Sequence, residues 1–417
     1  MKKSLFLPIL MYFILIITSC NRETFDNATP PKDSTSYKVS IYDATKELNN
    51  VLNITNTSLK SSADKRKIAD CKVIKNTRLK STADTTDVEG VLIYGFNLQD
   101  DNGNNAGFAL LPSDRRYPPI LAITDSGSLT DSIDNPGVKI FIQKTQNLIA
   151  KLTDSIKNAE KSITKATVST ASWSWPWENV SSIRLGVITN WRQGSPYNYY
   201  VPGPYAGCVP VAVGQVMAFH KYPLSYSGYS FNWAEMLSIP TSYSINDLGS
   251  NNIAKLMYYL GTSNNLNASY MIDGTGANTD NIQRTFKNFG YTNTGSNSSY
   301  NTTQVQFSIE SSKPVISYGY ALKDVTNNFL GLITTTKYSG GHAWVIDGIL
   351  IRRRLVGRAS QQNYEYETLV HCNWGWGGQA DGFYSSSSFD TNVGPITKSG
   401  TDYYYQYKIG AITGITK

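Results

Sequence analysis

Cys208, near the middle of the chain, has the surroundings of a catalytic nucleophile. It follows Gly207 and begins the segment C-V-P-V-A-V-G-Q-V-M-A-F-H, whose apolar residues predict a buried helix. A thiol at a helix amino terminus feels the positive end of the backbone dipole, which favours the thiolate. An isolated cysteine can equally be a small core residue. The spacing alone therefore leaves both interpretations of Cys208 open.

A cysteine nucleophile needs a base, and the chain contains three histidines. His220 lies twelve residues after Cys208, roughly 18 Å along a continuous helix, and this distance excludes it. His342 lies in G-G-H-A-W-V-I-D-G, and His371 lies in L-V-H-C-N-W-G-W-G-G. The glycines beside His342 leave its ring accessible, so we favour His342 as the base and keep His371 as the alternative. Either ring could instead be held by hydrogen bonds inside the core.

Two regions of regular structure must position these groups. Before residue 160 we expect a short strand at 38–41, a helix at 43–52, a hairpin of strands at 91–96 and 106–111, a strand at 118–124 and a helix from Asp134. Residues 161–172 are K-S-I-T-K-A-T-V-S-T-A-S, a composition typical of a linker and of a protease target. A larger region rich in Tyr, Trp and Gly follows.

Four short sequence blocks stand out in the larger region. They are W-R-Q-G-S-P-Y-N (191–198), G-C-V-P-V-A-V-G-Q-V-M (207–217), G-G-H-A-W-V-I-D-G (340–348) and H-C-N-W-G-W-G-G (371–378). They resemble the streptopain family of papain-like cysteine peptidases, and G-F-A-L-L-P-S-D-R-R-Y-P-P-I-L-A (107–122) resembles that family's inhibitory propeptide. The resemblance implies an α+β fold, in which a helix carrying the cysteine packs on an antiparallel sheet carrying histidine and asparagine, preceded by a small α+β prodomain.

The resemblance also implies roles for five residues. Cys208 matches the nucleophile and His342 the general base, which together would form a thiolate–imidazolium pair. Papain-like peptidases place the histidine about 130 to 150 residues after the cysteine, which suits His342. Asn373 matches the residue that orients the histidine, and Trp374 matches the indole that shields this contact from water. Gln193 matches the glutamine of the oxyanion hole.

Three segments need separate comment. Pro210-Val211 replaces the Ala-Thr that is common in the family, and a proline in a first helical turn costs little. The segment between Gly348 and His371 is longer than the family's usual hairpin. Residues 271–278 resemble a loop of the substrate cleft, although a glycine turn before a helix at 280–289 explains them equally well.

The amino terminus indicates export. Lys2-Lys3 precede an apolar run over residues 5–17, which fits a signal peptide and is too short for a membrane-spanning helix. The letters I-T-S-C resemble the bacterial lipoprotein box, in which Cys20 becomes lipidated, and a plain secretion signal is the alternative. We therefore expect a signal peptide at 1–19, a lipidated tether at 20–36 and a membrane-anchored protein outside the cytoplasm, in the periplasm or on the cell surface.

These observations predict a complete organisation for the chain. We expect an inhibitory propeptide domain at 37–160, an activation linker at 161–175 and a papain-like catalytic domain at 176–417. The predicted function is that of a lipid-anchored cysteine endopeptidase made as a zymogen, with protein or peptide substrates and with its own propeptide as inhibitor. A papain-like cell-wall amidase and a non-catalytic surface binding protein are the alternatives.

Composition bears on the remaining possibilities. The chain has 417 residues, 40 % of them apolar and 17 % charged, which excludes wholesale disorder. The net charge of +7 is not concentrated in a stripe, and Arg352-Arg353-Arg354 is interpreted as a solvated strand end, so nucleic acid is not expected as a partner. Three dispersed histidines and the lack of a C-x-x-C pair predict no metal, and no other cofactor is expected. Cys71 and Cys372 are expected to form no disulfide.

Overall fold

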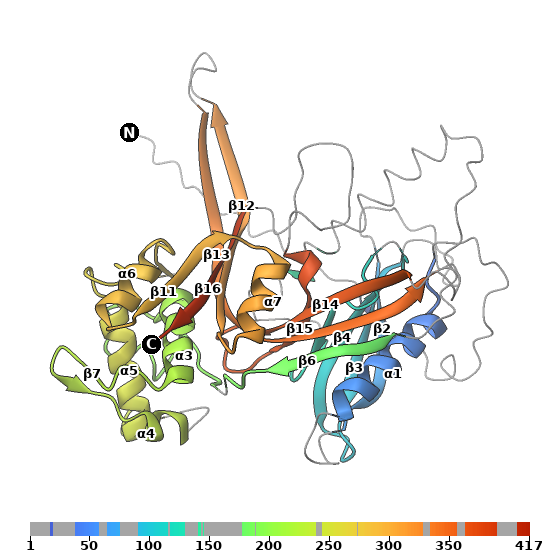
Figure 1. The fold of residues 1–417 in the computed structure, drawn as a ribbon, viewed down its shortest axis with the longest axis horizontal. Helices are drawn as coiled ribbons and strands as arrows, with labels where there is room; N and C mark the ends of the chain where they lie inside the picture. The colour runs from blue at the N-terminus through green and yellow to red at the C-terminus, as the bar shows by residue number, and fades with distance from the viewer. Residues whose placement is uncertain are drawn as a thin grey trace, which may run out of the picture.

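The computed structural model of the chain contains one large antiparallel sheet. It describes residues 17–19, 38–57, 65–75, 91–115, 117–129, 141–142, 145, 177–187, 189–238, 244–272, 274–327, 334–356, 363–389 and 407–417. The strand order is β1-β2-β3-β4-β5-β15-β14-β13-β12-β16-β11, and β6 pairs with β13 (Figure 1). Strands from both halves of the chain therefore belong to the same sheet.

The N-terminal region packs one helix on the first five strands of this order. Ala44, Leu48 and Leu52 recur about one turn apart on the helix and are buried, as the sequence predicts. The predicted hairpin is also confirmed, because its two strands pair in antiparallel register. The elements are β1 (Ile17–Ser19), α1 (Ile41–Thr57), β2 (Lys67–Lys75), β3 (Val91–Gln99), β4 (Asn105–Pro112) and β5 (Ala122–Thr124).

Two predicted strands of this region are shorter than expected. Lys38 forms only an isolated bridge with Asp114, residues 39–40 are in neither strand nor helix, and α1 begins at Ile41. β5 begins at Ala122 because Pro118 and Pro119 have no backbone N–H to give to a ladder. Most of the predicted helix from Asp134, the tether and the activation linker lie outside the described residues.

The C-terminal region places most of its helices on one face of the sheet. α3 is apolar all round, and its ten residues from Val209 to Ala218 are all buried, so it forms the centre of this helical layer. The predicted helix at 280–289 is confirmed as α6. The helices are α3 (Cys208–His220), α4 (Trp233–Ser238), α5 (Leu248–Gly261), α6 (Asn281–Asn288) and α7 (Thr302–Glu310).

Strand β13 (Thr334–Val356) connects the two parts of the sheet (Figure 1). Its first half pairs with β12, and its second half pairs with β14 and β6. Ala343 and Val345 face the α3 layer, whereas Trp344 and Ile346 belong to the core on the other face. The remaining strands are β6 (Glu178–Arg184), β7 (Ser225–Tyr226), β8 (Tyr229–Ser230), β9 (Ser269–Met271), β10 (Gly274–Gly276), β11 (Asn293–Ser299), β12 (Val315–Asn327), β14 (Asn363–Asn373), β15 (Gly382–Ser385) and β16 (Tyr407–Thr416).

The N-terminal and C-terminal regions share both a sheet and a core. β5 pairs with β15, which continues the ladder from one region into the other. Leu350, Leu369 and Phe383 of the C-terminal region are buried in the same cluster as the apolar face of α1. The two regions are therefore held together by a continuous strand ladder and by a shared hydrophobic core.

The environment of Arg352-Arg353-Arg354 differs from the predicted solvated strand end. Arg352 is fully buried and Arg354 is 6 % exposed, so these two arginines are not part of a solvated strand end, and only the side chain of Arg353 between them is 38 % exposed. The Arg352 guanidinium donates to Glu367 on β14 and, at 2.8 Å, to Glu47 on α1. Its buried position results from this pairing with carboxylates of both regions.

At the edge of the sheet, β1 pairs with β2 through residues of the predicted signal peptide. Removal of that peptide would leave β2 as the edge strand. Among the described residues, no helix is both long and apolar enough to cross a membrane.

Candidate active site

Cys208 lies at the first residue of α3, as the sequence predicts, and its side chain is half-buried. Gly207 precedes it with φ of 101°, a conformation that L side chains rarely adopt. Burial raises the pKa of the Cys208 thiol, although hydrogen bonding from the backbone N–H groups of Ala343, Val209 and Cys208 itself opposes the rise. These contacts place the sulfur beside the backbone of β13, at the residue that follows His342.

His342 lies on β13 and shares the face of Trp344, because alternate residues of a strand point the same way. Its ring packs beside both Trp344 and Trp374, at centroid distances of 6.2 and 6.0 Å, and the residue is 5 % exposed. Nε2 lies 3.0 Å from the carbonyl oxygen of Trp374. A carbonyl can only accept, so Nε2 carries the proton and Nδ1 is left as the ring's acceptor.

The Cys208 sulfur lies beside the backbone of Ala343, the residue that follows His342, and within the described part of the chain it is not hydrogen-bonded to the His342 ring. Burial lowers the pKa of His342 to about 4, and the bond to Trp374 only partly opposes this. With the thiol pKa raised, both groups are uncharged at neutral pH. This differs from the predicted thiolate–imidazolium pair, because burial disfavours both charges.

Asn373 faces α3 and does not contact His342. It pairs across the sheet with Val345, and directly paired residues lie on the same face. His342 lies three residues before Val345 and so points to the opposite face. The Asn373 amide donates to the carbonyl of Thr189 at 2.9 Å, and its oxygen accepts from Gln215 Nε2 at 2.8 Å. The predicted contact between Asn373 and the histidine is therefore not formed here.

The other resemblance-based residues lie around the same centre. Trp374 is fully buried, and its ring packs beside His342, where it excludes water. Gln193 is half-buried, and its carbonyl accepts from the N–H of Ala206 at 2.7 Å, two residues before Cys208. Cys20 lies outside the described residues.

The predicted cleft segment also approaches the nucleophile. β9 and β10 form a small hairpin over residues 269–276. The Thr275 hydroxyl donates to the carbonyl of Tyr205 at 2.6 Å, three residues before Cys208. The segment thus lies beside the loop that leads into α3, as a wall of a substrate cleft would.

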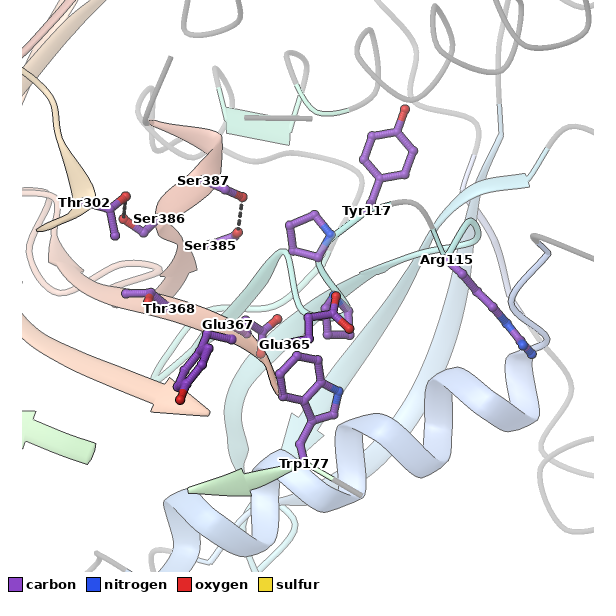
Figure 2. Close-up of a pocket in the computed structure, with 13 residues that line it drawn as sticks. Arg115, Tyr117, Trp177, Thr302, Glu365, Glu367, Thr368, Ser385, Ser386 and Ser387 are labelled. Carbon is purple, nitrogen blue, oxygen red and sulfur yellow. Dashed lines mark hydrogen bonds between the residues drawn. The ribbon is translucent and has the colours of Figure 1, made fainter. Parts of the chain in front are cut away.

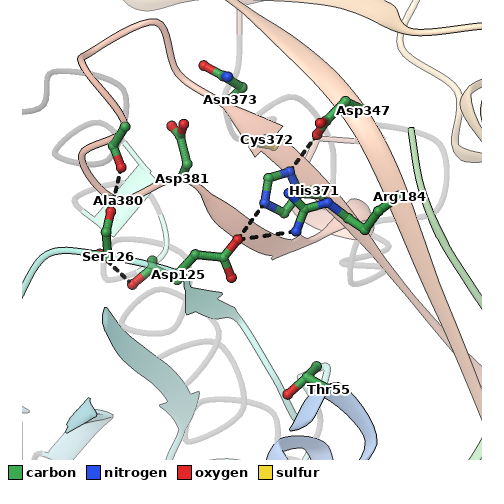
Figure 3. Close-up of polar contacts among 12 residues, drawn as sticks. Thr55, Asp125, Ser126, Arg184, Asp347, His371, Cys372, Asn373, Ala380 and Asp381 are labelled. Atoms are coloured by element: carbon green, nitrogen blue, oxygen red, sulfur yellow. Dashed lines mark hydrogen bonds and ion pairs between the residues drawn. The ribbon is translucent and has the colours of Figure 1, made fainter. Parts of the chain in front are cut away.

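The two remaining histidines are occupied elsewhere. His220 ends α3, and its Nδ1 lies 3.2 Å from the hydroxyl of Tyr291. His371 is buried between two carboxylates, with Nδ1 2.5 Å from Asp347 and Nε2 3.0 Å from Asp125 (Figure 3). Neither ring is placed to take a proton from Cys208.

The cluster around His371 joins the two regions of the molecule. Asp125 follows β5 in the N-terminal region, whereas His371 and Asp347 lie on strands of the C-terminal region. Asp125 also pairs with Arg184 at 3.2 Å (Figure 3) and with Arg66 at 3.3 Å. Arg184 and burial lower the pKa of His371, but the two carboxylates outweigh them and the net effect is a raised pKa. This cluster is not predicted from the sequence, although Asp347 lies in the same block as His342.

The N-terminal region also contacts the loop that follows Trp374. The N–H of Asp125 donates to the carbonyl of Asp381 at 2.7 Å, and the Ser126 hydroxyl donates to the carbonyl of Gly378. The Asp381 carboxyl in turn accepts from the N–H of Trp374 at 2.9 Å. A short path of contacts therefore runs from Asp125 to the residue that holds His342.

A cavity of about 290 Å³ lies at the seam between the two regions (Figure 2). Its walls come from the segment around Tyr117, from Trp177 and from β14 near Glu367. It contains none of the predicted catalytic residues. We interpret it as incomplete packing between the two regions.

No site for a metal ion is present in the described part of the chain, where no three His, Cys, Asp or Glu side chains gather in a suitable way. Cys71 and Cys372 are both buried thiols, and no disulfide joins them, as predicted.

Comparisons with known proteins agree with this geometry. Residues 191–384, which include all five predicted catalytic residues, match the model of the Peptidase C10 family. Streptopain of Streptococcus pyogenes is 26 % identical over 333 residues, which cover 70 % of this chain and 74 % of streptopain. The thiol protease/hemagglutinin PrtT of Porphyromonas gingivalis is 25 % identical over 332 residues, covering 70 % of this chain and 34 % of PrtT.

A solved structure shares the fold. A prointerpain A fragment from Prevotella intermedia matches with a TM-score of 0.50 and 22 % identity, covering 80 % of this chain and 96 % of the fragment. The match supports the predicted α+β, papain-like architecture with an N-terminal prodomain region. The match of residues 191–384 to the Peptidase C10 family, together with the similarity to streptopain over 70 % of the chain, identifies the chain as a cysteine peptidase.

Proposed function

We propose that the chain is an exported, lipid-anchored cysteine endopeptidase, made as a zymogen, which hydrolyses peptide bonds of proteins through Cys208 and His342. The placement of the Cys208 thiol carries the proposal. The thiol lies at the start of α3 and beside the backbone of Ala343, while the neighbouring His342 keeps Nδ1 as an acceptor. The proposal requires the thiol and the His342 ring to come together in the active enzyme.

The proposed reaction follows from these groups. His342 Nδ1 takes the thiol proton, and the thiolate attacks the substrate carbonyl carbon. The backbone N–H of Cys208 and the side-chain amide of Gln193 stabilise the oxyanion that forms. The imidazolium then protonates the leaving amine, and water, activated by the same ring, hydrolyses the acyl-enzyme.

The proposed zymogen is supported by the contacts between the two regions. They include the β5–β15 ladder, the Arg352–Glu47 ion pair and the His371–Asp125 pair. Trp177 lies two residues after the end of the predicted linker and packs under the guanidinium groups of Arg352 and Arg354, 5.1 and 4.8 Å from its ring centroid. A cut within 161–175 would leave Trp177 and β6 on the mature enzyme, while the N-terminal region would leave.

Three variants test the proposed chemistry. We expect Cys208→Ala and His342→Ala to abolish casein hydrolysis, self-cleavage and labelling by a thiol-directed epoxide. His220→Ala removes the same ring type at the far end of α3 and should retain turnover within a few-fold. Hydrolysis of muropeptides but not casein would favour the cell-wall amidase. A folded wild-type protein that reacts with neither substrate nor label would favour the binding protein.

The proposed lipid anchor is supported by the I-T-S-C box before the polar tether. Cys20→Ser should prevent incorporation of labelled palmitate and move the protein from the detergent phase to the aqueous phase. Cys71→Ser is the matched control, because it removes a buried cysteine and should leave the partitioning unchanged. Membrane retention of the Cys20 variant, with no palmitate in the wild type, would refute the anchor.

A further inference from the structure

Gln215 is a fully buried amide on the helix that carries the nucleophile. It lies seven residues after Cys208, which is about two helical turns, so the two residues share one side of α3. Its neighbours on the helix are apolar. A buried polar side chain in such surroundings needs hydrogen-bond partners, and those partners identify what it does.

The Gln215 amide group reaches from α3 to the end of β14. Nε2 donates to Asn373 Oδ1 at 2.8 Å and to the carbonyl of Thr189 at 3.2 Å. The other end, Oε1, is buried and has no hydrogen-bond partner among the described residues. Only the donor half of the amide is therefore used, and its shorter bond goes to Asn373.

Asn373 fixes the turn that contains Trp374. Besides the bond from Gln215, Asn373 Oδ1 accepts from the N–H of Gly375 at 3.1 Å, so the side chain closes a tight turn over Trp374. Gly375 has φ of 67°, and a Cβ there would lie 2.9 Å from Val211 on α3. The turn is thus pressed against the nucleophile helix.

The same turn positions the Trp374 carbonyl, which is the hydrogen-bond partner of the His342 ring. The N–H of Trp374 is fixed by Asp381, and the next N–H, of Gly375, is fixed by Asn373. The Trp374 carbonyl lies between these two anchored groups and accepts from His342 Nε2. Movement of the Asn373 side chain would therefore rotate the peptide group on which the His342 tautomer depends.

We propose that Gln215 is a positioning residue, which acts through Asn373 and the Trp374 carbonyl to hold His342 with its proton on Nε2 and its Nδ1 free for the Cys208 thiol. Because Gln215 and Cys208 share α3, the helix sets the position of the nucleophile and of the base together. This inference rests on the proposed roles of Cys208 and His342.

Kinetics of the mature enzyme give the first test. Gln215→Met keeps the length of the side chain but removes its donor, and we expect kcat on a peptide substrate to fall about tenfold to hundredfold with KM unchanged. Gln215→Glu should recover as the pH falls, because a protonated carboxyl donates to Asn373 Oδ1 and a carboxylate repels it. The control is Asn252→Leu, which removes a buried amide from α5 and should leave kcat and its pH profile unchanged.

A spectroscopic readout separates positioning from simple loss of stability. The full-length Cys208→Ala chain, labelled with ¹⁵N-histidine, contains only three imidazoles, and His220→Ala assigns one of them. We expect the His342 ring to be the Nε2–H tautomer, and we expect Gln215→Met to convert it into a mixture of tautomers. Asn252→Leu should leave the signal unchanged.

The outcomes distinguish this inference from the proposed function. An unchanged tautomer, together with a kcat loss no larger than that of Asn252→Leu, would refute the role of Gln215. Should Gln215→Met fail to fold, the pH-dependent recovery of Gln215→Glu decides the question, and a flat profile would refute the role. Full activity of Cys208→Ala or His342→Ala would instead refute the proposed function itself.

Discussion

At Cys208 two physical effects oppose each other, and the structure shows which is larger. The amino terminus of α3 and the backbone N–H of Ala343 favour the thiolate, but removal of the sulfur from water favours the thiol. Burial prevails, so the pKa of the thiol is raised. For His342, burial lowers the pKa to about 4. Both groups are therefore uncharged at neutral pH in this structure.

An uncharged Cys208 and His342 in the precursor, and the charged pair proposed for the mature enzyme, predict distinct alkylation profiles for the two forms. In the intact precursor, the rate of alkylation of Cys208 by iodoacetamide should rise only above the free-thiol pKa of about 8.5. In the mature form, a charged pair with His342 should extend the reactivity to acidic pH. Mass spectrometry checks this, because one measurement reports chain length and the modified peptide.

The buried Cys372 provides an internal control, because its thiol should stay unmodified over the same pH range. Equal acidic reactivity of Cys208 in intact and processed chains would contradict the prediction. It would mean that release of the N-terminal region does not change the state of the pair.

At the scale of elements, local pattern was enough for α1, α3, α6 and the β3–β4 hairpin. Each carries its periodicity or turn signal within its own residues, so the positions of Cys208 and His220 follow directly. The same holds for His342, because the apolar run that follows it, bounded by glycines at 340–341 and 348, predicts a strand. Asn373 was harder to predict, because the face it occupies depends on which residue of β13 it opposes. Its pairing with Val345 turns it towards α3 and away from His342.

The charged clusters could not be predicted from local pattern. Arg352 pairs with Glu47, which lies 305 residues away, and His371 pairs with Asp125, which lies 246 residues away. Within its own segment, Arg352 follows an apolar strand and has the features of a solvated end. Its pairing with Glu367 across the β13–β14 hairpin and the docking of Glu47 on α1 together change that environment. The contacts that the local sequence does not reveal are therefore those that join the two regions.

For the molecule as a whole, the N-terminal region extends the sheet and completes the core. Release of that region would expose the edge of β15 and the side chains of Leu350, Leu369 and Phe383. An unpaired edge and an apolar patch are both unfavourable in water, so the mature enzyme must cover them by rearrangement. The loop between Trp374 and Asp381 contacts Asp125 directly and leads into β15, which makes it the segment expected to move first.

The His371 cluster makes the docked state depend on pH, and the sign follows from the two pKa shifts. The pKa of His371 is raised, so its contribution is complete below the unfolded value of about 6.5 and is lost as the pH rises through the folded value. Burial alone would raise the pKa of Asp125, but His371, Arg184 and Arg66 outweigh burial, and the net effect is a lowered pKa. The contribution of Asp125 is therefore complete above about 3.9 and is lost as the pH falls. The cluster stabilises the precursor most between these limits.

Two neighbouring carboxyl groups, those of Asp381 and Asp347, also make the stability of the precursor depend on pH. Burial raises the pKa of Asp381 to about 7, so this carboxyl favours the unfolded state increasingly as the pH rises from about 4 to 7. Asp347 shares the ring of His371, and its lowered pKa adds to the loss on the acidic side. The contribution of Asp125 is therefore measured as the difference in melting temperature between two proteins that both keep Asp381 and Asp347 and differ only at residue 125.

We therefore predict that Asp125→Asn, introduced into the full-length Cys208→Ala precursor, lowers the melting temperature most at pH 5–6. Asp125 is 38 % exposed, so solvent screening limits the effect to about 1 kcal/mol, or roughly 1–2 °C in a chain of this size. The difference should shrink above the pKa of His371, because a neutral ring loses little when the carboxylate is removed. Calorimetry from pH 4 to 9 measures it, with Asp101→Asn on the exposed β3–β4 turn as the control. A difference that stays constant or grows above pH 8 would show that His371 does not carry the charge that joins the two regions.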